Sequence, residues 1–86
     1  MIKSVEKLDK DKWCVSIDSS KSNGLLHFTT EITIWIDHGD FVCADVLSSG
    51  GWCDYLDDEF HSFEREYPGL FEQALDAVNK QKEGDN

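Results

Sequence analysis

The fold is decided by the stretch LLHFTTEITIWI, which runs from Leu25 to Ile36. It is rich in β-branched residues, and its apolar residues recur at every second position, which predicts a long β-strand. The face expected to meet the core carries Leu26, Phe28, Thr30, Ile32, Ile34 and Ile36. The opposite face is polar except near its ends, where Leu25 and Trp35 lie. Trp35 is therefore a candidate binding anchor, with packing beneath the amino-terminal strand as the alternative.

Shorter strands are expected on both sides of this stretch. Residues 2–8 form a weakly patterned candidate, and residues 13–18 alternate with Trp13, Val15 and Ile17 on one face. Asn23-Gly24 offers residues that tolerate positive φ, as hairpin turns require.

The returning strand is expected at residues 41–47, after a turn at residues 37–40 in which Gly39 can adopt positive φ. Its register is open, because either of two sets can face inward. One set contains Phe41, Cys43, Asp45 and Leu47, and the other contains Val42, Ala44 and Val46. We prefer the second set because it leaves Asp45 out of the core.

The apolar period becomes helical after Gly51. Residues at three- and four-residue steps form one stripe, consisting of Trp52, Leu56, Phe60, Phe63 and Tyr67. Pro68 separates this helix from a second one over residues 70–81. The second helix is expected to bury Phe71, Ala74, Leu75 and Val78, and to pair Asp76 with Lys80.

These elements predict an α+β fold, a three- or four-stranded antiparallel β-meander followed by two C-terminal helices packed on one face. Residues 1–81 form a single domain, and residues 82–86 form a frayed tail. We expect the sheet face bearing Leu26, Phe28, Ile32 and Ile34 to be covered by Phe60, Phe63, Phe71 and Leu75.

Charge is the strongest indication of function. The net charge is −10, and between Ser22 and Val78 twelve acidic residues face a single basic residue, Arg65. A field of one sign steers basic surfaces toward it, and it repels nucleic acid and anionic membranes. The expected partner is therefore a basic protein, such as a nucleic-acid-binding effector or nuclease.

The predicted 52–67 helix would place a row of carboxylates on its outer face. A partner's Lys and Arg would pair with them instead of with phosphates, as in inhibitors of nucleases or of bacterial defence systems. That class includes nucleic-acid mimics of the anti-CRISPR or anti-restriction type and toxin-immunity proteins. The predicted partner-binding residues are Asp54, Asp57, Asp58, Glu59, Glu64 and Glu66, with Asp37, Asp40 and Asp45 at the rim and Trp35 as an apolar anchor.

Two other interpretations stay open. The acidity could serve only solubility, in an assembly protein that binds through the sheet face around Trp35. The carboxylates could also form a weak cation site, although Asp54, Asp57 and Asp58 lack the glycine-containing spacing of a calcium loop.

We predict no catalytic activity, no cofactor and no metal site. Cys14, Cys43 and Cys53 are odd in number and widely spaced, which favours reduced, largely buried thiols over a disulfide or zinc pattern. The histidines that could join them in a metal site or a Cys-His pair, His38 and His61, show no close ligand spacing. With no signal-peptide pattern and no membrane-spanning run, we expect a cytoplasmic protein.

Overall fold

The computed structural model describes the backbone of residues 2–23, 26–48 and 51–84, and the side chains of these residues outside 19–29. Its sheet has five antiparallel strands in the order of the chain, one more than the largest number predicted. The strands are β1 (Ile2–Asp9), β2 (Lys12–Asn23), β3 (Leu26–Asp37), β4 (Asp40–Ser48) and β5 (Gly51–Tyr55). A 3₁₀ turn, η1 (Asp57–Glu59), then leads into α1 (Phe60–Glu66) and α2 (Leu70–Gly84). The predicted α+β meander with two C-terminal helices is thus confirmed in outline.

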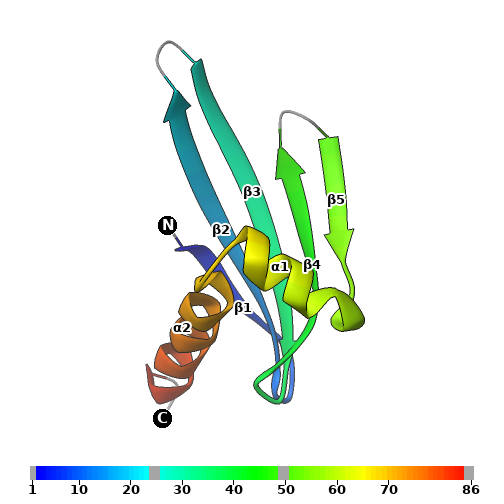
Figure 1. The fold of residues 1–86 in the computed structure, drawn as a ribbon. Helices are drawn as coiled ribbons and strands as arrows, with labels where there is room; N and C mark the ends of the chain where they lie inside the picture. The colour runs from blue at the N-terminus through cyan, green and yellow to red at the C-terminus, as the bar shows by residue number, and fades with distance from the viewer. Residues whose placement is uncertain (1, 24–25, 49–50, 85–86) are drawn as a thin grey trace.

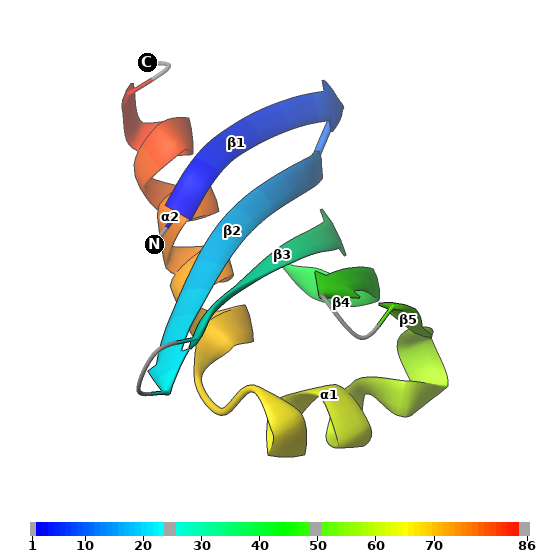
Figure 2. The same cartoon turned by 90° about the horizontal axis from the view of Figure 1, so that it is seen from above.

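Both helices lie on the same face of the sheet, which we call the inner face (Figure 1; Figure 2). Helix α2 packs against β1, β2 and β3, and α1 packs against β4 and β5. No helix of the described residues covers the opposite face, which we call the outer face. No described helix is long and apolar enough to cross a membrane.

The core lies between the inner face and the two helices. Alternation places Val15, Ile17, Ile32, Ile34 and Ile36 there, all essentially without solvent exposure. From the helices, Phe63, Ala74 and Val78 are buried against them, and Phe71 and Leu75 are half-buried. The predicted contact between the long strand and the helices is therefore present at these positions, while the side chains of Leu26 and Phe28 lie outside the described part.

The turn between β3 and β4 lies at one end of the sheet (Figure 1). His38 and Gly39 both have positive φ, 53° and 82°, as in the two-residue turns that match the twist of a hairpin. The backbone amide of His38 also donates to the carbonyl of Asp11 in the neighbouring β1–β2 turn, at 2.8 Å. The predicted turn at Asn23-Gly24 involves residues 24 and 25, which lie outside the described residues.

The predicted inward set of β4 is correct for Ala44 and Val46 but wrong for Val42. Trp35 pairs with Cys43, whereas the next residue, Ile36, pairs with Phe41, so Val42 is the extra residue of a β-bulge. The bulge reverses the alternation and turns Phe41 inward, leaving Val42 41% exposed. The Phe41 ring then contacts the rings of Phe60, Phe63 and Phe71 at centroid distances of 5.0, 5.5 and 5.8 Å.

The predicted helix over residues 52–67 is also wrong in its first part. Residues 51–55 form β5 and pair with residues 44–48 of β4, so Tyr55 lies opposite Ala44 and Trp52 opposite Leu47. Tyr55 points inward and meets the Phe63 ring at 5.4 Å, which fixes the alternation of the strand. Trp52, predicted to be core, is 68% exposed as a result.

The second helix matches its prediction closely. It buries Ala74 and Val78, and the Lys80 Nζ lies 3.8 Å from an Asp76 carboxylate oxygen. It extends to Gly84, so the predicted frayed tail over residues 82–86 is wrong for residues 82–84. The Lys82 Nζ lies 3.9 Å from a carboxylate oxygen of Asp11 in the β1–β2 turn.

Candidate protein-binding surface

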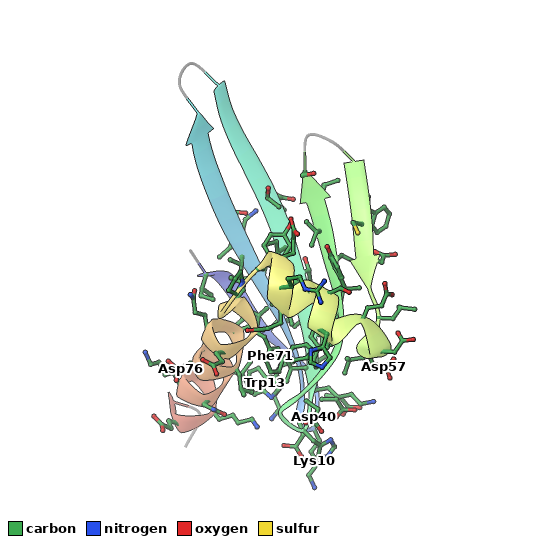
Figure 3. All side chains as sticks on the ribbon, in the orientation of Figure 1. Lys10, Trp13, Asp40, Asp57, Phe71 and Asp76 are labelled. Atoms are coloured by element: carbon green, nitrogen blue, oxygen red, sulfur yellow. The ribbon has the colours of Figure 1, made fainter. Side chains whose placement is uncertain are left out.

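The predicted acidic helix does not exist as one surface. Asp54 belongs to β5, and Asp57, Asp58 and Glu59 form η1, so only Glu64 and Glu66 of the predicted set lie on α1. Figure 3 shows the spread, with Asp57 near the end of β5, Asp40 at the β3–β4 turn and Asp76 on α2. The sequence periodicity had placed these carboxylates in one row, and the fifth strand separates them.

Two of the predicted carboxylates also hold the local backbone. Glu59 Oε1 accepts a hydrogen bond from the backbone amide of Leu56 at 3.2 Å, which closes the entry to the helical region. Glu64 Oε1 accepts from the backbone amide of Gly69 at 3.1 Å, which links α1 to the tight turn before α2. Gly69 has a φ of 77°, a conformation that glycine adopts without strain. These hydrogen bonds give Glu59 and Glu64 a structural role that does not require a binding partner.

A second group of predicted residues lies at the end of the sheet, around the β3–β4 turn. Asp37 contacts His38 Nδ1 at 2.5 Å, while His38 Nε2 lies 3.5 Å from a carboxylate oxygen of Asp11. Asp40 is exposed beside them. These charges form a local network that ties two turns together.

The outer face gathers the features expected of a docking surface. The pairing of β2 to β5 places three rows of side chains across it. The first row is Cys14, Trp35 and Cys43; the second is Ser16, Thr33, Asp45 and Asp54; the third is Glu31, Leu47 and Trp52. An antiparallel sheet with one face open to water normally has polar residues on that face. This one carries large apolar side chains.

Among the hollows on the outer face, two are built around a tryptophan. The Trp35 hollow, of about 160 Å³, is lined by Leu8, Lys12, Trp13, Trp35, Ile36, Asp37 and Val42. The Trp52 hollow, of about 230 Å³, is lined by Glu31, Thr33, Asp45, Leu47 and Trp52. Trp35 is half-buried between its neighbours, whereas Leu47 and Trp52 are 52% and 68% exposed. The apolar anchor predicted at Trp35 thus has a second, more exposed counterpart at Trp52.

Asp45 and Asp54 lie opposite one another in the middle row, and Asp45 also lines the Trp52 hollow. Partial burial, followed by the hydrogen bond with Asp54 and the negative charge of Asp54, together raise the pKa of Asp45 to about 6. Asp45, predicted as a rim charge, is therefore at the centre of the outer face. The pair presents carboxyl oxygens where a cation from a partner would relieve their repulsion.

Sequence reasoning missed Val42 and Trp52 as surface residues, whereas the preferred register of residues 41–47 already left Leu47 on the outer side with Asp45. Val42 was assigned to the core by that register and Trp52 by helical spacing, and the signal that could have corrected Trp52 is the alternation in Gly51–Tyr55. Trp52 and Asp54 alternate with Cys53 and Tyr55 there, as in a strand with two different faces.

The thiols give no sign of reactive or metal chemistry. Cys14, Cys43 and Cys53 are free, but Cys14 and Cys43 are only half-buried and Cys53 is exposed, so the prediction of largely buried thiols is wrong for Cys53. Burial raises the pKa of both Cys14 and Cys43, and nearby acidic groups, Glu6 for Cys14 and Asp45 for both thiols, raise it further. Within the described residues, no three side chains of His, Cys, Asp or Glu are grouped so as to hold a metal ion.

A comparison of the chain with protein-family models, curated proteins and solved structures finds no match.

Proposed function

We propose that this protein is a non-catalytic binding module that occupies a basic surface of another protein through its outer face. The observation that supports this most is the combination of exposed Leu47 and Trp52 with the carboxylates of Glu31, Asp45 and Asp54 in one region of the sheet. Interfaces use large apolar and aromatic residues for affinity and surrounding charges for orientation and rate.

The proposed mechanism is competition. Lys and Arg side chains that a partner uses to bind phosphates would pair with the outer-face carboxylates, so that the module and a nucleic acid exclude each other. A nuclease or a defence effector with a basic nucleic-acid channel fits this chemistry, which is the logic of nucleic-acid mimics and of immunity proteins. The net charge of −10 would speed the encounter at low ionic strength.

Two double variants with the same change in charge test where the partner binds. Glu31→Gln with Asp54→Asn removes two negative charges from the outer face, and Asp57→Asn with Asp58→Asn removes two from η1. After a partner has been captured from the native cell and purified, we expect the outer-face variant to associate roughly tenfold more slowly at low salt. The η1 variant should associate within about twofold of the wild type. The same rates and salt slopes for all three proteins would contradict the proposal.

A second candidate is favoured by the exposure of Leu47 and Trp52 itself. An assembly protein could bind through these apolar groups while its charge serves only solubility. In that case the affinity would fall on Trp52→Ser yet depend little on ionic strength, since salt screens charges and not apolar contacts. A competition experiment separates the two functions directly. If this protein displaces nucleic acid from the purified partner, the first function is supported; if both bind the partner together, the second is supported.

A further inference from the structure

The outer face has the form of a sheet that lacks its second layer. On the inner face, the apolar stripe of α2 packs against β1, β2 and β3. On the outer face, two apolar hollows are uncovered among the described residues, about 13 Å apart along β3 because Trp35 and Glu31 are four residues apart in a strand. Sheets bury an apolar face against helices or another sheet.

An occupant lying on this face must satisfy its own backbone. In the middle row β2, β3 and β4 are each paired with a strand on both sides, so they offer no free backbone ladder there to an extended peptide lying above them. A peptide added at the edge of β1 or β5 would not reach both hollows. An α-helix satisfies its backbone internally, and its side chains can enter both hollows at once.

Charge specifies the other face of that helix. Asp45 lines the Trp52 hollow on the side of the middle row, and Asp54 lies opposite it on β5. Glu31 lines the same hollow, and its carboxylate is 3.5 Å from the Lys3 Nζ. Lys12 is the basic residue at the Trp35 hollow. A helix that brings Lys or Arg to the middle row would therefore meet Asp45 and Asp54, and the residues that line the Trp52 hollow include no basic side chain.

We propose that the outer face receives a basic amphipathic helix of the partner, with one large apolar side chain in each hollow and a Lys or Arg between them over Asp45 and Asp54. This inference rests on the proposed function and names the kind of segment that the partner presents. At about 1.5 Å per residue, a separation of about 13 Å corresponds to between eight and nine residues, so the two apolar side chains are about eight residues apart and the basic residue lies about one turn from each.

Three synthetic 18-residue peptides test this proposal. The first has Leu at the two anchor positions and Lys over the middle row and on the flanks; the second replaces every Lys with Glu; the third has the composition of the first with its Leu residues dispersed around the helix. We expect the first peptide to bind at least tenfold more tightly than either of the others, measured by fluorescence anisotropy. Equal binding of the first and third peptides would overturn the proposal, because charge alone would then explain the binding.

Variants of this protein complete the test. Leu47→Ser with Trp52→Ser should weaken binding of the first peptide at least tenfold, and Asp45→Asn should weaken it severalfold. Leu56→Ser is the matched control, since Leu56 is 56% exposed but lies outside the sheet, and it should change nothing. Thermal unfolding of each variant checks that it is folded.

The two proposals fail separately. If no peptide binds, yet Glu31→Gln with Asp54→Asn slows association with the captured partner, then the helix is the wrong occupant and the proposed function stands. If the first peptide binds as expected but the captured partner ignores the outer face, then the proposed function is wrong for that partner. Loss of neither interaction on changing the outer face contradicts both.

Discussion

Asp45 faces Asp54 across β4 and β5, and two carboxyls in such a position favour sharing one proton. The pKa of Asp45 is raised to about 6 in the folded protein, by burial first and then by Asp54, against about 3.9 for a free aspartate. Between these values the folded state holds more protons than the unfolded state. The free energy of unfolding contributed by this group is therefore full below pH 4 and is lost as the pH rises through 6.

Asp45→Asn should remove this pH dependence. At pH 7 we expect the variant to be more stable than the wild type by about 1 kcal/mol, a figure reduced for the partial exposure of the pair. Near pH 4 the two proteins should be equally stable to within about 0.5 kcal/mol. Urea unfolding at pH 4, 5, 6 and 7 measures the difference, and a difference that does not change with pH would contradict the shared proton. Comparing the two proteins at each pH cancels the contributions of groups that they share.

At the scale of elements, the bulge at Val42 decides which aromatic residue joins the core. Phe41→Ala should lower the free energy of unfolding by about 3–4 kcal/mol, because the ring contacts Phe60, Phe63 and Phe71. Val42→Thr should cost less than about 0.5 kcal/mol, because the side chain faces solvent. The register without a bulge predicts the opposite order, so chemical denaturation of the two variants distinguishes them.

Phe63 joins α1 to the sheet. Its side chain is fully buried, and its ring meets those of Phe41, Tyr55 and Tyr67 at 5.5, 5.4 and 5.5 Å. Phe63→Ala should cost about 3–5 kcal/mol, a large part of the stability of a domain this size. Leu56→Ala, the exposed control, should cost under about 0.5 kcal/mol in the same denaturation experiment. A cost below about 1 kcal/mol for Phe63→Ala would show that α1 is not held by this ring.

The sequence predicts those elements whose pattern is local. The alternation of Trp13, Val15 and Ile17 and the stripe of α2 are set by one burying face each, and both are as predicted. The spacing of Trp52 and Leu56 is helical as well, but a strand partner for residues 51–55 was available at β4. Pairing between strands is a tertiary contact that periodicity within one segment does not contain, and it decided the fifth strand.

The residues of the candidate site also divide into those placed by a local pattern and those placed by pairing between strands. Trp35 could be predicted as an outer-face residue because it lies in the well-patterned strand, and Asp45 could be kept out of the core by its charge. The preferred register of residues 41–47 also left Leu47 on that face, but Trp52 and Asp54 could not be placed beside these residues, since that requires the position of β5. The row of carboxylates was predicted on one helix because residues 51–55 were assigned to that helix and not to a strand.

At the scale of the whole molecule, charge and exposed apolar surface occur together. The net charge of −10 belongs to a chain whose sequence pI is about 4.4, so the repulsion between two copies disappears in mildly acidic solution. We expect light scattering to show association of the wild type near pH 4.4 and not at pH 7 in low salt. Leu47→Ser with Trp52→Ser should reduce that association, whereas Leu56→Ser should leave it unchanged.

The outer face thus sets a condition on the chain's own behaviour in a crowded cell. Two tryptophans and their apolar neighbours on an uncovered sheet would make identical molecules adhere to each other, and the carboxylates on this face give every copy the same sign at that spot. These carboxylates would attract a basic surface and repel a second copy of the same protein. The carboxylates on this face therefore disfavour self-association while they favour a basic partner. Replacing them with neutral residues should increase self-association before it lowers the stability of the fold.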